Sequence, residues 1–322
     1  MKAITFDRIG APDEVLQLSE LSVPTIKDNE VLIRMVAASI NPGDFLFIQN
    51  LYPEPKKPVF PKQIAGNHGA GIIEQAGKQV SLKPGTFVAF SYYNTWAEYA
   101  VVPAEWLIEL PIGYPVELAS QFVNLITSWD LLQQSGVEAG GWLALTAGNS
   151  AVSTMVTQFA RQKGIRIIAI VGHARKKNPQ DVAIIDLSVK NGSIHHQIMD
   201  LTRGKGVNAI IDNVGGPVTG ELLRSTSFGG KLIINGGMST ERFELHNFDI
   251  LMKGLVIKSH VYRYFFKPPQ KEDAAMLWEI AEKSGQPGFL WTIGGMHALA
   301  DFKIAIDESI QYPERGKHIF RM

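Results

Sequence analysis

The sequence predicts an α/β protein of two domains, one rich in β-strands and one built as a doubly wound parallel sheet. Three observations support this. The chain has 322 residues, which is more than one hydrophobic core usually spans. Residues 1–110 contain short apolar runs separated by Gly and Pro turns, a pattern typical of β-structure. Residues 142–262 then alternate strand and helix patterns, which favours a parallel sheet covered by helices.

In the first domain we expect strands at residues 31–40, 69–77, 87–90 and 95–102. The stretch 114–134 has a helical pattern. Near the end of the chain we expect amphipathic helices at 271–284 and 298–310 and a closing strand at 318–320, which would return to the first domain. The predicted domains are therefore 1–117 with 263–322, and 118–262.

In the second domain we expect strands at 142–147, 165–171, 207–214, 231–235 and 255–262, and a helix at 218–228. Gly148, Asn149 and Ser150 form the turn between the first of these strands and a helix. The N–H groups at such a helix N-terminus can bind the pyrophosphate of a dinucleotide. The usual G-x-G-x-x-G is missing, so an ordinary βαβ crossover that binds nothing is the alternative.

The connection after residues 165–171 indicates which cofactor would bind. It is short and contains Pro179, so the usual crossover helix is expected to be trimmed. NAD-binding proteins usually carry an acid here, whereas this chain has His173, Arg175 and Lys176. These groups suit a 2′-phosphate and favour NADPH. A solvated basic loop is the alternative.

The composition excludes several classes of protein. Acidic and basic residues number 31 each, so no overall charge favours nucleic acid or a membrane surface. The absence of cysteine rules out disulfides and thiolate metal sites. No apolar run approaches the roughly 18 residues of a membrane span, and the N-terminus lacks a targeting pattern. We expect a cytoplasmic protein with no nucleic-acid or membrane partner.

Several motifs carry a resemblance that covers nearly the whole chain. They are Ile-Asn-Pro-Gly-Asp at 40–44, Lys-Pro-Gly at 83–85, Thr-Trp-Ala-Glu at 95–98, Gly-Lys-Gly-Val at 204–207, Asp-Asn-Val-Gly-Gly at 212–216 and Gly-Lys at 316–317. With them the chain resembles the medium-chain dehydrogenase/reductase superfamily, which has a GroES-like catalytic domain and a Rossmann-type domain. The run Ile-Gln-Asn-Leu-Tyr at 48–52 and the turn at 147–153 resemble the zinc-free 2-enoyl thioester reductases. His68 departs from that subgroup, which usually carries glutamate there, and Asn50 replaces a glycine.

The resemblance implies candidate site residues. Tyr52 would be a catalytic proton donor or carbonyl-orienting hydroxyl, since a phenol is protonated at neutral pH; the alternative is a loop aromatic that shields a cleft. Asn41 would lie near the nicotinamide ribose or the substrate, with a local Asx-turn as the alternative. The cofactor residues would be Asn124, Thr127, Gly148, Asn149, Ser150, Ala151, Val152, His173, Arg175, Lys176, Asn213, Gly236, Gly237, Met238 and Lys317.

The implied activity is NADPH-dependent reduction of an activated C=C bond, with an enoyl-CoA or enoyl-ACP thioester as substrate. A quinone or alkenal oxidoreductase of the same fold is one alternative, and a cofactor-binding protein without turnover is another. A catalytic zinc is not expected, because the chain has no cysteine and no His-x-x-x-His pair beside a suitable acid. Residues 255–262 read as an apolar edge strand, which favours a homodimer paired across a two-fold axis.

Overall fold

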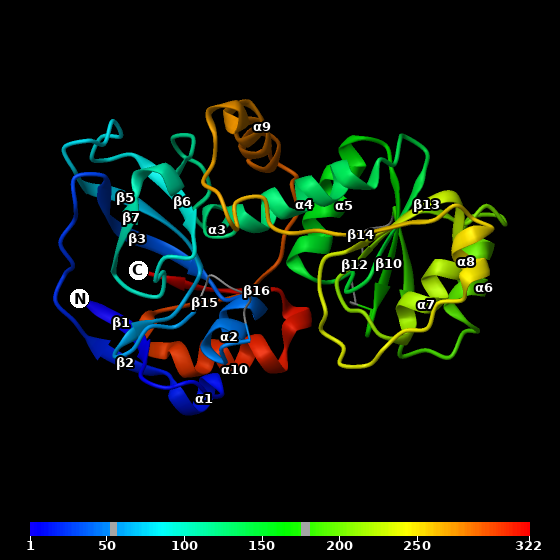
Figure 1. Cartoon of the computed structure of the whole chain (residues 1–322), viewed down its shortest axis with the longest axis horizontal. Helices are drawn as coiled ribbons and strands as arrows, with labels where there is room; N and C mark the ends of the chain where they lie inside the picture. Colours follow the sequence, from blue (N-terminus) through cyan, green and yellow to red (C-terminus); the bar gives the residue numbers. More distant parts are fainter. Residues whose placement is uncertain (52–56, 175–180) are drawn as a thin grey trace. The chain divides into compact units, whose positions relative to one another are not determined.

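The structure is a computed structural model that describes residues 1–51, 57–174 and 181–322 (Figure 1). The chain divides into two compact units. The first contains Met1–Leu125 and Phe266–Met322, and the second contains Ile126–Phe265. The domains predicted from the sequence end at 117/118 and 262/263. That these domains fold independently stays a prediction.

The first unit is built around β3 (Glu30–Ser39), which is mostly apolar and buries most of its side chains. β3 pairs antiparallel with β5 (His68–Ala76) along most of its length. On its other side it pairs first with β7 (Tyr99–Pro103) and then with β16 (Lys317–Arg321). The resulting seven-stranded sheet has the order β15-β16-β3-β5-β6-β8, with β7 beside β3. β16 therefore places the C-terminal segment next to the first strands of the chain.

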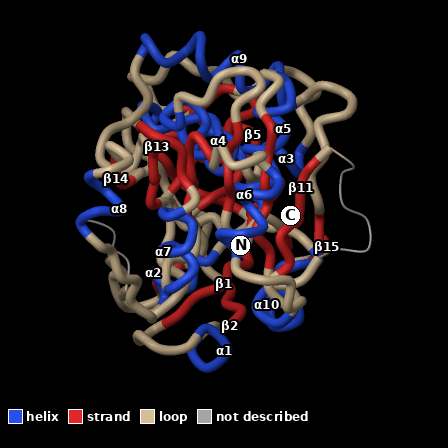
Figure 2. The backbone as a smooth tube through the Cα atoms, turned by 90° about the vertical axis from the view of Figure 1, so that its right-hand side faces the viewer, coloured by secondary structure: helices blue, strands red, loops and turns tan. Residues whose placement is uncertain are grey.

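The other elements of this unit are shorter. A second sheet has the order β2-β1-β4, and Figures 1 and 2 both show β1 and β2 beside α1 and α10. The bounds are β1 (Lys2–Phe6), α1 (Pro12–Val15), β2 (Gln17–Glu20), α2 (Pro42–Ile48), β4 (Gln63–Ile64), β6 (Phe87–Ser91), β8 (Ile108–Glu109), α3 (Val116–Ala119), α9 (Ala274–Ser284), β15 (Ile293–His297) and α10 (Phe302–Gln311).

The second unit contains a six-stranded sheet in the order β11-β10-β9-β12-β13-β14. Every neighbouring pair is parallel. Figure 1 shows α5 on one face and α6 and α7 on the other, so the prediction of a doubly wound parallel sheet is confirmed. The bounds are β9 (Trp142–Leu145), α5 (Ala151–Gln162), β10 (Arg166–Val171), β11 (Val182–Asp186), α6 (Ile194–Leu201), β12 (Val207–Asp212), α7 (Pro217–Arg224), β13 (Thr226–Ile234), α8 (Asn247–Leu251) and β14 (Val256–Ser259). α4 (Phe122–Ser135) begins in the first unit and ends in the second.

Some expected elements differ from the observed ones. The helix expected at 218–228 ends at Arg224, and residues 226–228 belong to β13. Thr226 pairs with Val207, so a β-branched residue joins the sheet where the helical pattern was extended too far. The helix expected at 114–134 is divided into α3 and α4, and β14 is shorter than the predicted strand 255–262. β11, which pairs with β10, was not predicted.

The expectation of a trimmed crossover between β10 and β11 stays a prediction, because most of this connection lies outside the described residues. Residues 172–174 and 181, the described part of this connection, contain no helix. Arg175, Lys176 and Pro179 lie outside the described residues. Among the described helices, none combines the length and the hydrophobicity of a membrane span.

Candidate functional site

Asn41 is held by side-chain contacts between β3 and α2. Its Nδ2 donates to Ser39 Oγ over 2.9 Å and lies 3.2 Å from His68 Nδ1. Its Oδ1 accepts from Asn124 Nδ2 over 3.1 Å. Asn41 and Asn124 are both buried. The structure thus brings two predicted site residues together and adds His68, which the sequence singled out only as a departure from the resembled subgroup.

Asp44 supports this arrangement from the first turn of α2. Its side chain is fully buried and accepts from the backbone N–H groups of Asn41 (2.7 Å) and Asn67 (2.8 Å). Burial raises the pKa of Asp44 to about 7, while these two N–H groups and the charge of Lys317 act in the opposite direction. Asp44 has the structural role expected for an acid at this helix start.

Lys317 and His68 complete the cluster. Lys317 Nζ donates to the backbone carbonyl of Ile40 over 2.9 Å. Burial lowers the pKa of Lys317 to about 8, opposed by Asp44. Burial and then Lys317 lower the pKa of His68 to about 3. His68 is therefore a neutral imidazole near pH 7, so it can orient Asn41 through a hydrogen bond but cannot act as an imidazolium acid.

In the second unit, the predicted phosphate-binding turn leads directly from β9 into α5. Ser150 is the N-cap of α5, and its Oγ accepts from Ser153 N over 3.2 Å. The amides of Ala151 and Val152, which begin the helix, have no intrahelical carbonyl to bind. A Cβ on Gly148 would lie 2.6 Å from Ala169 Cβ, so glycine allows close packing of the turn on β10. These features fit the phosphates of a dinucleotide.

Asn213 occupies the carboxyl end of β12. Its Nδ2 donates to Thr146 O (3.0 Å) and Ser153 Oγ (3.1 Å), and its Oδ1 accepts from Asn235 Nδ2 (2.6 Å). Gly236 lies against Asn213, because a Cβ there would be 2.4 Å from its carbonyl oxygen. The side chain of Asn213 therefore joins the ends of three strands to α5, which makes it a positioning residue in this structure.

The other predicted cofactor residues of this unit are more exposed. Asn149 Nδ2 donates to His173 O over 2.9 Å, which ties the turn to the loop after β10. Met238 is 66% exposed, Gly237 has open space around it, and Thr127 is half-buried on α4. Arg175 and Lys176 lie outside the described residues. The preference for NADPH therefore stays a prediction.

Sequence reasoning missed Asp186, at the end of β11. Its Oδ2 accepts from Ala174 N over 2.8 Å, and its Oδ1 accepts from Ser188 N and Oγ. These bonds, the one from the Ser188 hydroxyl first, lower the pKa of Asp186. A carboxylate thus lies against the loop where the sequence offered only basic groups. The feature that could have identified Asp186 is its position as the last residue of β11, a strand that the sequence analysis did not predict.

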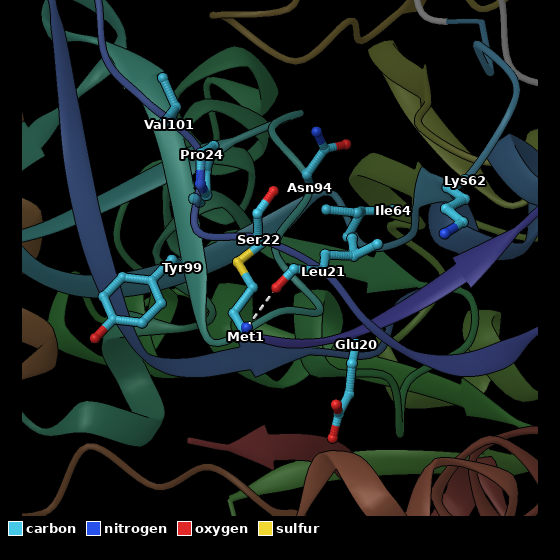
Figure 3. A pocket seen from close by; sticks show the side chains of 11 residues that line it. Met1, Glu20, Leu21, Ser22, Pro24, Lys62, Ile64, Asn94, Tyr99 and Val101 are labelled. Carbon is cyan, nitrogen blue, oxygen red and sulfur yellow. Dashed lines mark hydrogen bonds between the residues drawn. The ribbon is translucent and has the colours of Figure 1, made fainter.

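Tyr52 lies outside the described residues, so its catalytic role stays a prediction. The first unit also has a hollow of ≈ 450 Å³ lined by Met1, Glu20, Leu21, Ser22, Pro24, Lys62, Ile64, Asn94, Tyr99, Ala100 and Val101 (Figure 3). Met1 N donates to Leu21 O beside it, over 2.6 Å. No predicted site residue lines this hollow.

Comparisons with known proteins identify the family. Residues 27–112 match the alcohol dehydrogenase GroES-like domain, and residues 151–280 match the zinc-binding dehydrogenase family. The human mitochondrial enoyl-[acyl-carrier-protein] reductase is 30% identical over 258 residues, covering 75% of this chain and 67% of that protein. The chain belongs to the medium-chain dehydrogenase/reductase superfamily.

Solved structures confirm the fold of this medium-chain reductase. The Escherichia coli quinone oxidoreductase complexed with NADPH has a TM-score of 0.85 at 21% identity, covering 100% of both chains. The Etr1p/NADP/crotonyl-CoA complex has a TM-score of 0.80 at 19% identity, covering 100% of this chain and 99% of that one. The superfamily assignment makes the protein an NAD(P)H-dependent oxidoreductase. Whether it works without zinc, as the missing cysteines suggest, stays a prediction.

Proposed function

We propose that this medium-chain reductase uses NADPH to reduce the activated C=C bond of a 2-enoyl thioester. The observation that carries the proposal is the cluster that the buried Asn124 and the half-buried His68 form with Asn41. Asn41 belongs to the motif that resembles 2-enoyl thioester reductases. The 30% sequence identity to the human mitochondrial enoyl-[acyl-carrier-protein] reductase supports the same substrate class. When bound, NADPH supplies the hydride.

The chain must then bind the cofactor, orient the thioester and supply a proton. We assign the cofactor phosphates to the amides of Ala151 and Val152 at the start of α5. The side chain of Asn41 cannot swing freely, because its amide nitrogen and oxygen both have protein partners. A fixed amide of this kind can position a ribose or carbonyl group without reorganisation.

Tyr52 is the proposed source of the proton. Reduction at the β-carbon leaves negative charge on the thioester enolate, which must be stabilised and protonated at the α-carbon. A protonated phenol can donate to either the oxygen or the carbon, and general acid catalysis typically contributes roughly 10²–10⁴-fold. Asp44 accepts from the backbone N–H of Asn41, and Lys317 donates to the carbonyl of Ile40. We assign both residues to holding the backbone at Asn41 and not to transferring this proton.

Tyr52→Phe tests this proposal, because it removes the hydroxyl and keeps the ring. We expect NADPH affinity to stay near wild type, while turnover of crotonyl-CoA falls at least tenfold, a threshold set below the roughly 10²–10⁴-fold that general acid catalysis typically contributes. Tyr312→Phe is the matched control: Tyr312 is 37% exposed and stacks against Arg315, so its hydroxyl should not affect turnover. Unchanged turnover in Tyr52→Phe would assign the proton to solvent.

The same assay separates the alternative activities. A quinone is the control substrate, because its reduced form can take protons from water, so Tyr52→Phe should slow its reduction much less. Crotonyl-CoA, an alkenal and a quinone should be compared side by side with wild-type protein. Preference for the quinone or alkenal would replace the enoyl thioester, and NADPH binding without oxidation of any substrate would indicate a binding protein.

A further inference from the structure

Three potential metal ligands converge in the first unit, away from the residues assigned above. They are His297 at the end of β15, His318 on β16 and Glu308 on α10, elements labelled in Figure 1. His297 Nε2 lies 3.0 Å from His318 Nδ1, and each of these nitrogens lies 3.7 Å from Glu308 Oε2. One ligand atom from each element therefore faces the same small volume.

The register of the sheet explains why the two histidines meet. β15 and β16 are parallel, with Gly295 opposite His318 and His297 opposite Phe320. Residues two apart on a strand share a face, so His297 and His318 are diagonal neighbours on one side of the sheet. Their rings stack with centroids 5.2 Å apart and an interplanar angle of 27°. Strand pairing therefore places both imidazoles on the same face of the sheet.

The two histidine nitrogens are within hydrogen-bond distance of each other, but their distances to Glu308 fit a shared cation better than a hydrogen bond. Metal–ligand bonds of about 2.1 Å in tetrahedral geometry place ligand atoms about 3.4 Å apart, and the three observed separations are 3.0, 3.7 and 3.7 Å. The Glu308 oxygen is too far from either nitrogen for a hydrogen bond, which ends near roughly 3.2 Å. It nevertheless lies at the same distance, 3.7 Å, from both of them.

Glycine leaves room for these groups. A Cβ on Gly295 would lie 2.5 Å from His297 Nε2 and 3.1 Å from His318 Nδ1. A side chain at this position would therefore press on both ligand nitrogens.

Of the charged side chains that act on His318, Glu308 favours a cation, whereas Lys317 and Arg315 oppose one. His318 has 1% of its side chain exposed, His297 has 11% and Glu308 has 33%, so the site opens to solvent on the side of Glu308. Lys317 is next to His318 on β16 and therefore points to the opposite face of the strand, where it binds the Ile40 carbonyl. The Arg315 guanidinium packs over the Tyr312 ring, 3.9 Å from its centroid.

We propose that His297, His318 and Glu308 bind one divalent transition-metal ion, with Zn²⁺ as the preferred ion. The ligands are His297 Nε2, His318 Nδ1 and Glu308 Oε2, and water fills the remaining position from the side of Glu308. Such an ion ties β15, β16 and α10 together and stabilises the fold where the C-terminal segment returns to the first unit. It is independent of the proposed reductase chemistry.

The test uses the full chain without an affinity tag, stripped with EDTA and desalted. Calorimetric titration with ZnCl₂ should show one Zn²⁺ per chain with a micromolar or lower dissociation constant, and Zn²⁺ should raise the thermal unfolding temperature. Glu308→Gln and His297→Gln should each weaken binding at least tenfold and remove the thermal shift. Gly295→Ala keeps all three ligands but crowds them, so it should also weaken binding.

Asp307→Asn is the matched control, because Asp307 is the neighbouring exposed acid on α10 and its carboxylate accepts from Gln311 in the same helix. Its Zn²⁺ affinity should equal that of wild type. The proposal is overturned if wild-type protein binds no stoichiometric Zn²⁺ at 100-micromolar concentrations, on the order of a hundred times the expected constant. It is also overturned if Glu308→Gln and His297→Gln bind as tightly as Asp307→Asn.

Discussion

Protonation of His68 links the buried cluster at Asn41 to pH. Burial, with a further contribution from Lys317, lowers the pKa of His68 from 6.5 to about 3. Between these values the unfolded chain binds a proton that the folded chain excludes. The stabilising contribution of neutral His68 is therefore fully present above pH 6.5 and is lost as pH falls toward 3. The slope is at most about 1.4 kcal/mol per pH unit.

His68→Gln removes this titration and keeps a side-chain amide that can hydrogen-bond to Asn41. From pH 6.5 to 5.0 the limiting slope amounts to about 2 kcal/mol. His68 is half-buried and solvent screens part of the effect, so we expect wild type to lose about 1–2 kcal/mol more than the variant. Urea unfolding followed by tryptophan fluorescence at pH 7.5, 6.5, 5.5 and 5.0 gives this difference.

The comparison between the two proteins isolates His68 from other groups. Burial also lowers the pKa values of His195, His260 and His318, but these residues titrate equally in wild type and variant. NMR titration of the histidine Cε1–H resonances measures the pKa directly and should lose one resonance with a low pKa in His68→Gln. Equal pH slopes in the two proteins, or a measured pKa of His68 near 6.5, would refute the reasoning.

Three further predictions concern the cofactor and the assembly. Arg175→Ala should weaken NADPH binding by roughly 1.5–3 kcal/mol, the cost of losing a charged contact to phosphate, and leave NADH unaffected; equal wild-type affinities for both cofactors, measured by fluorescence titration, would remove the argument. Gly148→Ala forces a Cβ to within 2.6 Å of Ala169 Cβ, so calorimetry should show destabilisation of about 1–3 kcal/mol together with weaker NADPH binding. Unchanged stability and unchanged NADPH affinity would show that the turn moves to accommodate the added Cβ. β14 is an edge strand, and Leu251 in the preceding helix is 71% exposed, so light scattering should detect a homodimer that Val256→Lys dissociates. A 35.5 kDa species alone would contradict the pairing.

Local patterns were sufficient for most of the fold. The alternation of strands and helices between residues 142 and 262 predicted the doubly wound sheet, because hydrophobic periodicity records which face of each element is buried. The same patterns failed at element ends. The helical pattern ran past Arg224 into Thr226–Ile234, where pairing with β12 decides the conformation. β11 was missed because the connection before it is too short for the usual crossover helix, so the residues that follow were not interpreted as a further parallel strand.

Only part of the candidate site could be predicted from the sequence. Motifs near Asn41 and Gly148 indicated where substrate and cofactor would bind, since turns and helix caps depend on neighbouring residues. The contacts that define the sites join residues far apart along the chain: Asn41 with Asn124, Ala174 with Asp186, and the group of His297, Glu308 and His318. Strand register and burial create these contacts and their pKa shifts. The sequence by itself therefore determined the fold class and the family, and only the tertiary structure decided which polar groups meet.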